Sequence, residues 1–189
     1  MSLYRHFRNN IKTYLFFVLL ICFYPLTAKC ENYPTSPSGV VEQYIKMDYV
    51  GKGLSSSGWN VYTTWIDGPG WDTVMVVDGY KIGVAKISGN TASVAVQYKV
   101  IGLIDGYTWH GLKDKSFTDQ ARLEVNPTFE LVKKDGRWLI KTPQFRPHVS
   151  VKVILEHLKT LLTGPADDPE QIKLENTIKI ISSISKGKK

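Results

Sequence analysis

Cysteine is scarce in this chain of 189 residues, which contains only Cys22 and Cys30. Cys22 lies inside an apolar N-terminal run, so a chain that has lost this run keeps at most Cys30. The count excludes an internal disulfide framework and any cysteine-rich metal site. We therefore expect the fold to be stabilised by a hydrophobic core rather than by covalent or metal cross-links.

Long apolar runs are also missing, because the unbroken run Leu15–Phe23 has only nine residues. A membrane-spanning helix needs about 20 apolar residues. Arg5, Arg8 and Lys12 precede the run, and a proline and small residues follow it, an order typical of a secretory signal peptide. We predict a signal peptide over residues 1–30 and a periplasmic or secreted domain without a membrane span. An uncleaved N-terminal anchor is the alternative.

The end of this leader predicts how it is processed. Ala28 and Cys30 place small residues at the two positions that signal peptidase inspects, which predicts cleavage before Glu31. Cleavage after Ala28 is the alternative. Lipid attachment at Cys30 requires a small residue just before it, and the lysine at position 29 disfavours a lipoprotein.

Excess positive charge is small once the leader is set aside. The chain has 24 Lys and Arg against 17 Asp and Glu, a net charge of +7. Residues 1–30 hold four of the positive residues and no acidic one, so residues 31–189 carry 20 against 17, or +3. Three of these lysines lie in the last four positions. We therefore do not expect a nucleic-acid partner.

Motifs for the common catalytic chemistries are absent from the sequence. It contains no GxSxG, HExxH, P-loop or dinucleotide-binding motif. His148 and His157 are nine positions apart, which does not place two metal ligands on one helix turn. His157 falls off the apolar stripe of its predicted helix, so we expect it to be solvated. The sequence predicts neither a metal site nor a cofactor.

Helical signals occur at both ends of the remaining chain. Ser36-Pro37 predicts the start of a helix that continues until the glycines at positions 51 and 53. Residues 59–65 are predicted to form a short second helix or an aromatic lid, and Asp67-Gly68-Pro69-Gly70 a turn. Ser150 is expected to cap a helix with the apolar stripe Val151, Ile154, Leu155, Leu158, Leu161 and Leu162. A last helix from residue 168 is expected to pack on the domain through Leu174, Ile178 and Ile181.

The middle of the chain alternates apolar and polar residues, which predicts β-strands. Residues 80–87 and 91–101 flank the turn composition Ser88-Gly89-Asn90. Val94, Val96, Tyr98 and Val100 share the apolar face of the second strand. Residues 102–119 are predicted to be a glycine-rich connection, and residues 122–134 a third strand with Pro127 at an edge or bulge.

Asp135-Gly136 is the strongest hairpin signal in the chain, because both positions tolerate positive φ. A turn there pairs Lys134 with Arg137, Lys133 with Trp138, Val132 with Leu139, Leu131 with Ile140 and Glu130 with Lys141. Phe129, Leu131, Trp138 and Ile140 then share one face, and the lysine at position 133 lies over the indole. We therefore interpret this basic, aromatic stretch as a hairpin rather than as a binding site.

From about residue 36 to 162, the chain resembles the nuclear transport factor 2-like superfamily. The stretches that carry the resemblance are SPSGVVEQYIK, GYKIGVAKISGNTASVAVQYKVIG and FELVKKDGRWLIKTP. The resemblance implies an α+β fold in which a strongly curved antiparallel sheet packs around N-terminal helices and leaves a pocket between them. We predict this domain over residues 31–164 and a C-terminal helix with a basic tail over residues 165–189.

Isomerase-like members of that superfamily place a few polar groups in the apolar pocket. By this analogy Tyr44 is a candidate hydrogen-bond donor, Asp67 or Asp72 a candidate general base, and His110 a candidate acid or base. Each also has a structural reading: a core tyrosine, turn-forming aspartates and an exposed loop histidine. The family pattern requires a second acid deep on the sheet, and Gln97, Lys99 and Glu124 do not match it.

Aromatic residues crowd two regions that reach the pocket mouth in this fold. They form either lid packing or the wall of an apolar ligand or partner site. These candidates for the ligand pocket are Trp59, Tyr62, Trp65, Trp71, Tyr107 and Trp109.

The leading hypothesis is an exported, non-catalytic domain that binds a small apolar molecule or an envelope protein. The first alternative is a small hydrolyase or isomerase that uses Asp67 or Asp72 with Tyr44 or His110. The second is an accessory subunit that docks through its exposed sheet face or its last helix. A cavity lined by two or more polar titratable groups favours the enzyme, whereas a pocket filled by Trp and Val side chains favours the binding or accessory protein.

Overall fold

The computed structural model describes residues 33–54, 58–66, 72–114, 117 and 119–187, and the predicted signal peptide lies outside them. Helix α2 (Pro37–Tyr49) comes first, followed by two short 3₁₀ helices, η1 (Lys52–Leu54) and η2 (Gly58–Tyr62). Ser36 caps α2 as predicted, since its hydroxyl accepts a hydrogen bond from Gly39 N–H at 3.1 Å.

Over the described residues, a seven-stranded sheet follows, in which β3 is the longest strand and pairs with four others. The continuous strand order is β6-β5-β3-β1-β7, and β2 and β4 pair with the two ends of β3. The strands are β1 (Thr73–Ile82), β2 (Lys86–Ser88), β3 (Thr91–Asp105), β4 (Thr108–Gly111), β5 (Thr128–Lys134), β6 (Arg137–Thr142) and β7 (His148–Ser150).

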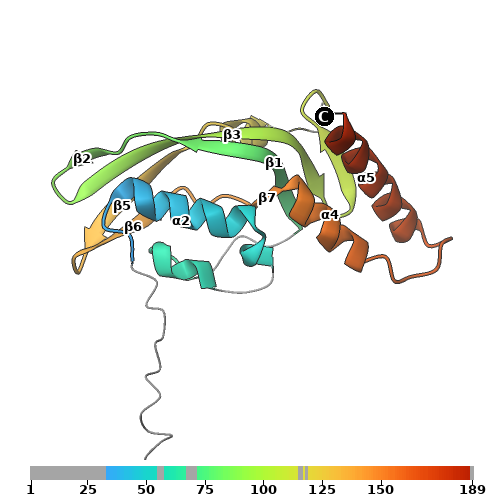
Figure 1. Cartoon of the computed structure of the whole chain (residues 1–189), viewed down its shortest axis with the longest axis horizontal. Helices are drawn as coiled ribbons and strands as arrows, with labels where there is room; N and C mark the ends of the chain where they lie inside the picture. Colours follow the sequence, from blue (N-terminus) through green and yellow to red (C-terminus); the bar gives the residue numbers. More distant parts are fainter. Residues whose placement is uncertain (1–32, 55–57, 67–71, 115–116, 118, 188–189) are drawn as a thin grey trace, which may run out of the picture. The chain divides into compact units, whose positions relative to one another are not determined.

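The sheet is strongly curved, and α2 lies along one of its faces (Figure 1). Register shifts between Val76 and Val77, and between Val77 and Tyr80, bend β1 against β3. Every pair is antiparallel except β1 with β7, which run parallel. The α+β class with a curved sheet is therefore confirmed, and the sheet is mixed because of its last short strand.

Helix α2 contributes one apolar face to the core. Val40, Val41 and Ile45 are fully buried there, and Tyr44 is 7% exposed. On the sheet, the predicted apolar faces are confirmed, because Val94, Val96, Tyr98 and Val100 are buried, as are Phe129, Leu131, Trp138 and Ile140. These two faces meet because α2 contacts β1, β3, β6 and β7.

The β5–β6 hairpin forms as predicted from Asp135-Gly136, where φ is +50° and +78°. The four pairs from Lys134–Arg137 to Leu131–Ile140 are confirmed, and Lys133 Nζ lies 5.7 Å from the centre of the Trp138 ring. The predicted pairing of Glu130 with Lys141 is wrong. A register shift between Glu130 and Leu131 places Glu130 opposite Thr142.

Three other predicted elements differ in extent. The first strand begins earlier, at Thr73, and breaks near Gly83, whose added Cβ would lie 2.9 Å from the Ala95 carbonyl oxygen. The connection predicted over residues 102–119 is partly β, because β3 continues to Asp105 and turns at Gly106 (φ +56°) into β4.

The strand predicted from residue 122 begins only at Thr128, and helix α3 (Asp119–Leu123) precedes it. Proline has no N–H for the ladder, so Pro127 interrupts regular pairing. Its carbonyl and that of Val125 still accept hydrogen bonds from the Val96 and Tyr98 N–H groups. Glu124 therefore lies in a turn beside the sheet rather than on a strand.

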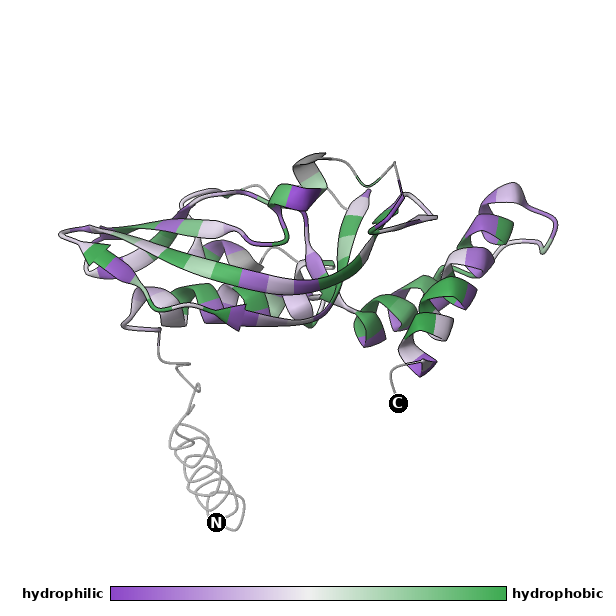
Figure 2. Cartoon of the chain, turned by 90° about the horizontal axis from the view of Figure 1, so that it is seen from above, coloured by the Kyte–Doolittle hydropathy of each residue, from purple (hydrophilic) through white to green (hydrophobic). Residues whose placement is uncertain are grey.

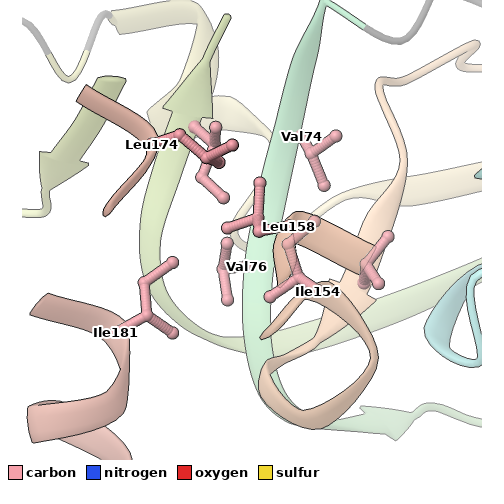
Figure 3. Close-up of a cluster of buried hydrophobic side chains, with 8 residues drawn as sticks. Val74, Val76, Ile154, Leu158, Leu174 and Ile181 are labelled. Atoms are coloured by element: carbon pink, nitrogen blue, oxygen red, sulfur yellow. The ribbon is translucent and has the colours of Figure 1, made fainter. Parts of the chain in front are cut away.

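Two C-terminal helices build a second hydrophobic cluster against β1 and β3. Ser150 caps α4 (Val151–Thr160) as predicted, and α5 (Pro169–Lys186) contacts α4 and β4. Their apolar residues face each other and the sheet (Figures 2 and 3). The buried members of the cluster are Val74, Val76, Ile104, Val149, Ile154, Leu158, Leu174 and Ile181. This confirms that the last helix packs on the domain.

In the part of the chain that the structure describes, no helix has the length and apolarity needed to cross a membrane.

The hairpin gives a direct test of the turn chemistry. Replacing Gly136 by alanine forces a Cβ into a conformation with φ +78°, so the free energy of unfolding should fall by about 1 kcal/mol. Gly79→Ala is the control, because a Cβ there meets no atom within 4 Å and needs no positive φ. Chemical denaturation of both variants measures the difference, and equal stability of the two variants contradicts the assigned turn.

Candidate functional site

Two of the residues predicted for the site, Asp72 and Tyr107, line one cavity of about 500 Å³. Asp72 immediately precedes β1, and Tyr107 lies in the turn between β3 and β4. Their approach follows from the pairing of β1 with β3, since the Gly106 N–H donates to the Asp72 carbonyl at 2.6 Å. The sheet register therefore brings together two side chains that are 35 positions apart in sequence.

The rest of the cavity wall is mainly aliphatic. One wall is the end of the sheet, and the other is α4 with Leu54 of η1. Val74, Ile154 and Leu158 converge there between β1 and α4 (Figure 3). The complete set of described lining residues is Leu54, Asp72, Val74, Ile104, Gly106, Tyr107, Ile154, His157, Leu158 and Leu161.

His157 is a lining residue that the sequence analysis placed in solvent. It is half-buried on α4 and borders the cavity. The expectation of a solvated histidine is therefore wrong in part. An apolar helical stripe marks one buried face, whereas α4 contacts the sheet and α5 and also borders the cavity.

The other predicted candidates do not line this cavity. Tyr44 lies on the buried face of α2. The centre of its ring is 6.5 Å from that of Trp65 and 6.0 Å from that of Phe129, both in edge-to-face geometry. Burial raises the pKa of the Tyr44 hydroxyl far above its ordinary value, and the charge of Asp48 adds to the shift. Tyr44 is therefore a protonated hydrogen-bond donor at every physiological pH.

The remaining aromatic candidates are dispersed. Tyr62 is buried in η2, and the buried indole N–H of Trp65 has no acceptor among the described residues. Trp109 and His110 are half-buried on β4, opposite Ile104 and Leu103. Trp109 also covers Gly102, where an added Cβ would lie 2.3 Å from its ring. Asp67, Trp71 and the side chain of Trp59 lie outside the described residues.

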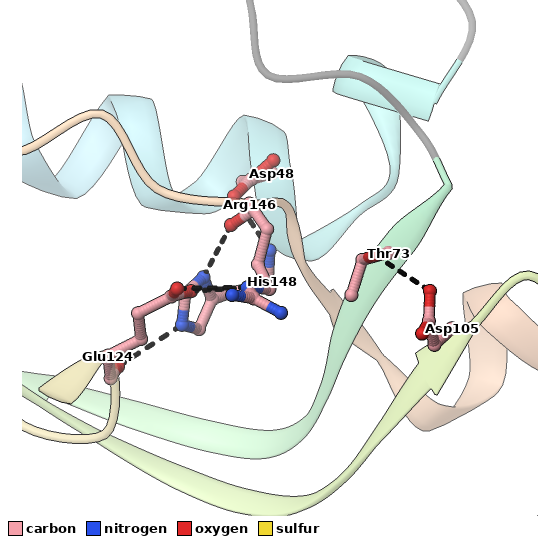
Figure 4. Close-up of polar contacts among 6 residues, drawn as sticks. All are labelled: Asp48, Thr73, Asp105, Glu124, Arg146 and His148. Carbon is pink, nitrogen blue, oxygen red and sulfur yellow. Dashed lines mark hydrogen bonds and ion pairs between the residues drawn. The ribbon is translucent and has the colours of Figure 1, made fainter. Parts of the chain in front are cut away.

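A buried polar cluster centred on His148 includes the contact between α2 and β7 (Figure 4). The His148 backbone N–H donates to Asp48 Oδ2 at 2.8 Å, which joins the end of α2 to the start of β7. The two ring nitrogens of His148 face carbonyl oxygens, that of Arg146 at 2.9 Å and that of Glu124 at 3.2 Å. A neutral imidazole carries one N–H and can donate to only one of them.

Two further groups close the cluster. Arg146 Nε donates to both carboxylate oxygens of Glu124, at 2.9 and 3.1 Å, and the Glu124 side chain is only 2% exposed. The Tyr98 ring stacks on the His148 ring with 4.1 Å between centres. The cluster therefore contains one charge-assisted pair, Arg146 with Glu124, and one ring stack, Tyr98 with His148.

Burial shifts the pKa values of this cluster in opposite directions. It raises the pKa of Asp48 to about 7, although the His148 N–H opposes the shift. It lowers the pKa of His148 to about 4, although the two carbonyl groups favour the protonated ring and oppose it. Burial also raises the pKa of Glu124 against the opposing effect of Arg146, and it raises that of Tyr98.

The two shifts favour a protonated Asp48 and a neutral His148 in the folded protein. Between pH 4 and 6.5 an unfolded chain holds Asp48 charged and His148 protonated, whereas the fold favours neutral forms of both. The Asp48 shift makes stability fall as pH rises from 3.8 towards 7. The His148 shift makes stability fall as pH drops from 6.5 towards 4. The two slopes oppose each other, so the intact pair leaves stability nearly independent of pH in this window.

Sequence reasoning missed this cluster. One signal was present, because Asp48 lies four positions after Tyr44 and hence on the same side of α2. The other members of the cluster come together through tertiary contacts between residues 22 to 100 positions apart. Among the described residues, no group of three or more His, Cys, Asp or Glu side chains is placed to hold a metal ion.

A second hollow of about 420 Å³ lies over β1 and β3 and is lined by Gly79, Tyr80, Lys81, Gln97, Tyr98 and Lys99. It is more open than the first cavity, and its described lining residues belong to β1 and β3 rather than to α4. Its polar side chains include Lys99, which is 70% exposed and pairs with Asp78 at 2.6 Å. Surface ion pairs of this kind contribute little to the free energy of unfolding.

Comparison with known proteins gives no relative for this chain. No family model, no curated protein and no solved structure matches it.

The opposed titrations can be separated by substitution at Asp48. Asp48→Asn keeps an acceptor for the His148 N–H and removes the buried charge, so at pH 8 it should raise the free energy of unfolding by on the order of 2 kcal/mol. At pH 4 this gain in the free energy of unfolding should vanish. Chemical denaturation of the variant and the unmodified protein between pH 4 and 8 measures the gain at each pH. Asp78→Asn is the control at a surface ion pair, and a loss of stability in Asp48→Asn at pH 8 contradicts the account.

The free energy of unfolding of His148→Gln should depend on pH in the opposite sense to that of Asp48→Asn. Without the histidine titration, the Asp48 slope remains, so the stability of this variant should decline as pH rises from 4 to 7. The slope is the measured quantity, because loss of the ring stack on Tyr98 lowers the absolute stability at every pH. A variant with a flat or rising profile contradicts the raised pKa of Asp48.

Proposed function

We propose that this protein, once exported, binds a small molecule with a mainly apolar body in the cavity between the sheet and α4. The observation that carries the proposal is the cavity of about 500 Å³, of whose ten described lining residues six are aliphatic. Small-molecule sites typically measure about 300–1,000 Å³ and combine an apolar wall with a few polar groups. This cavity has both properties.

The expected affinity is moderate. Burial of apolar surface contributes about 25 cal/mol per Å², so a ligand that buries about 200 Å² gains roughly 5 kcal/mol before the costs of association. The wall is already in place, because Val74, Ile104, Ile154 and Leu158 are at most 5% exposed and are packed in the core. Little of the binding energy is therefore spent on ordering the site.

Binding is favoured over catalysis by the placement of the ionisable groups. Asp72 is exposed, whereas catalytic bases usually lie where solvent is excluded. Neither Tyr44 nor His110, the proposed partners of Asp72 in an acid-base pair, is among the lining residues. The polar residues are therefore better suited to orient a ligand than to transfer a proton.

Membership of the nuclear transport factor 2-like superfamily is part of the proposal. The curved sheet, with α2 along one face, supports it. The cavity differs from the pocket that the resemblance implies, since it lies against α4 rather than beneath α2. Export rests on the leader pattern of residues 1–30.

A small hydrolyase or isomerase is the second candidate function. It is favoured by the presence of three titratable side chains, Asp72, Tyr107 and His157, around one cavity. Mass spectrometry of small molecules that co-purify with the protein separates the two functions. A binding protein and its Asp72→Asn variant retain the same compound, whereas an enzyme whose base is removed retains a substrate that the unmodified protein converts.

Filling the cavity tests the binding proposal. Leu161→Trp places an indole against the lining, so affinity for the uncharged fluorescent probe N-phenyl-1-naphthylamine should fall at least tenfold. Leu162→Trp is the matched control, because residue 162 is the next in sequence, is 38% exposed and does not line the cavity. Fluorescence titration measures both variants after circular dichroism has confirmed their fold.

A second filling variant, Leu54→Trp, approaches the cavity from η1 and should reproduce the loss. The proposal is contradicted if the unmodified protein does not bind the probe. It is also contradicted if Leu161→Trp and Leu54→Trp bind as tightly as Leu162→Trp.

A further inference from the structure

Asp72 brings a carboxylate to the cavity from the sheet side, and His157 lines it from α4. Among its described lining residues, Asp72 is the only acidic side chain, and lysine and arginine do not occur. Asp72 and Val74 are two positions apart at the start of β1 and both border the cavity. The carboxylate is exposed, and the valine is 5% exposed, so a negative group stands at the mouth and an apolar wall lies deeper.

An aromatic ring accompanies this carboxylate. Tyr107 borders the same cavity from the β3–β4 turn, and its backbone carbonyl accepts a hydrogen bond from Thr177 Oγ1 at 2.6 Å. The face of a tyrosine ring attracts cations, and the attraction increases as the site is desolvated. A carboxylate and an aromatic ring that line one cavity both attract a positive group.

We infer that the occupant is an amphiphilic amine, with an apolar chain against the aliphatic wall and an ammonium group beside Asp72 and Tyr107. This rests on the proposed binding function and adds the chemical class of the ligand. An anionic amphiphile of the same length meets the Asp72 carboxylate with its own charge and is disfavoured. A neutral one gains the apolar contacts alone.

The positive net charge of the chain does not reverse this preference. The sequence carries +7 overall, of which the leader contributes a large part. Charges separated by more than about 8 Å are largely screened at physiological ionic strength. A ligand head group in contact with Asp72 therefore responds to that carboxylate more than to distant lysines.

Three ligands with the same chain and different heads test the inference. Octyltrimethylammonium, octanol and octanoate each displace N-phenyl-1-naphthylamine, and the ammonium compound should bind about fivefold more tightly than octanol, with octanoate weakest. In Asp72→Asn the preference for the ammonium compound over octanol should disappear, while the affinity for octanol is unchanged. Added NaCl should reduce the preference in the unmodified protein.

Asp105→Asn is the matched control. This aspartate lies at the same end of the sheet, but its carboxylate accepts a hydrogen bond from Thr73 Oγ1 at 3.2 Å (Figure 4) and does not line the cavity. It should leave the ranking of the three ligands as it is. Equal loss of the preference in both variants overturns the role of Asp72.

The outcomes separate this inference from the proposed function. If the neutral probe binds and Leu161→Trp blocks it, but the three heads bind alike or octanoate binds best, the inference is wrong and the binding function stands. If the probe does not bind, both are wrong. An ammonium preference that Asp72→Asn abolishes supports both.

Discussion

The hydrogen bond from the His148 backbone N–H to Asp48 Oδ2 is the contact on which the rest of this structure depends. It joins the end of α2 to β7, the short strand that runs parallel to β1 at one edge of the sheet. Ser150, the last residue of β7, caps α4. The contact therefore holds the short strand that leads directly into α4, and α4 supplies one wall of the cavity. The buried Asp48 carboxyl stabilises this contact in its protonated, neutral form, which is consistent with its raised pKa of about 7.

The local parts of the fold were predictable from sequence because they depend on local chemistry. Ser36 and Ser150 signalled their helices through capping, and Asp135-Gly136 specified a turn with positive φ. Errors arose where the backbone departs from a regular ladder. The register shift beside Glu130 and the interruption at Pro127 depend on how β5 adapts to the curved sheet, and residue alternation does not reveal such shifts.

The candidate site was predictable only in part. Asp72 was a candidate by analogy with the isomerase-like members of the superfamily and Tyr107 through aromatic crowding, and the β1–β3 register brings them together. His157 was misjudged, since a helical stripe identifies the most buried face and not a second neighbour. The pairs Asp48–His148 and Glu124–Arg146 join segments 100 and 22 positions apart, so only the folded chain shows them.

The central claim is that the hollow against α4 is a ligand site. The most direct test is an amide NMR titration of the protein with N-phenyl-1-naphthylamine. The account predicts chemical-shift changes concentrated at residues 104–107 and 154–161, which border this cavity from the sheet and from α4. Chemical-shift changes confined to residues 79–81 and 97–99, which border the hollow over β1 and β3, would contradict this claim. The absence of any change at saturating probe would contradict it as well.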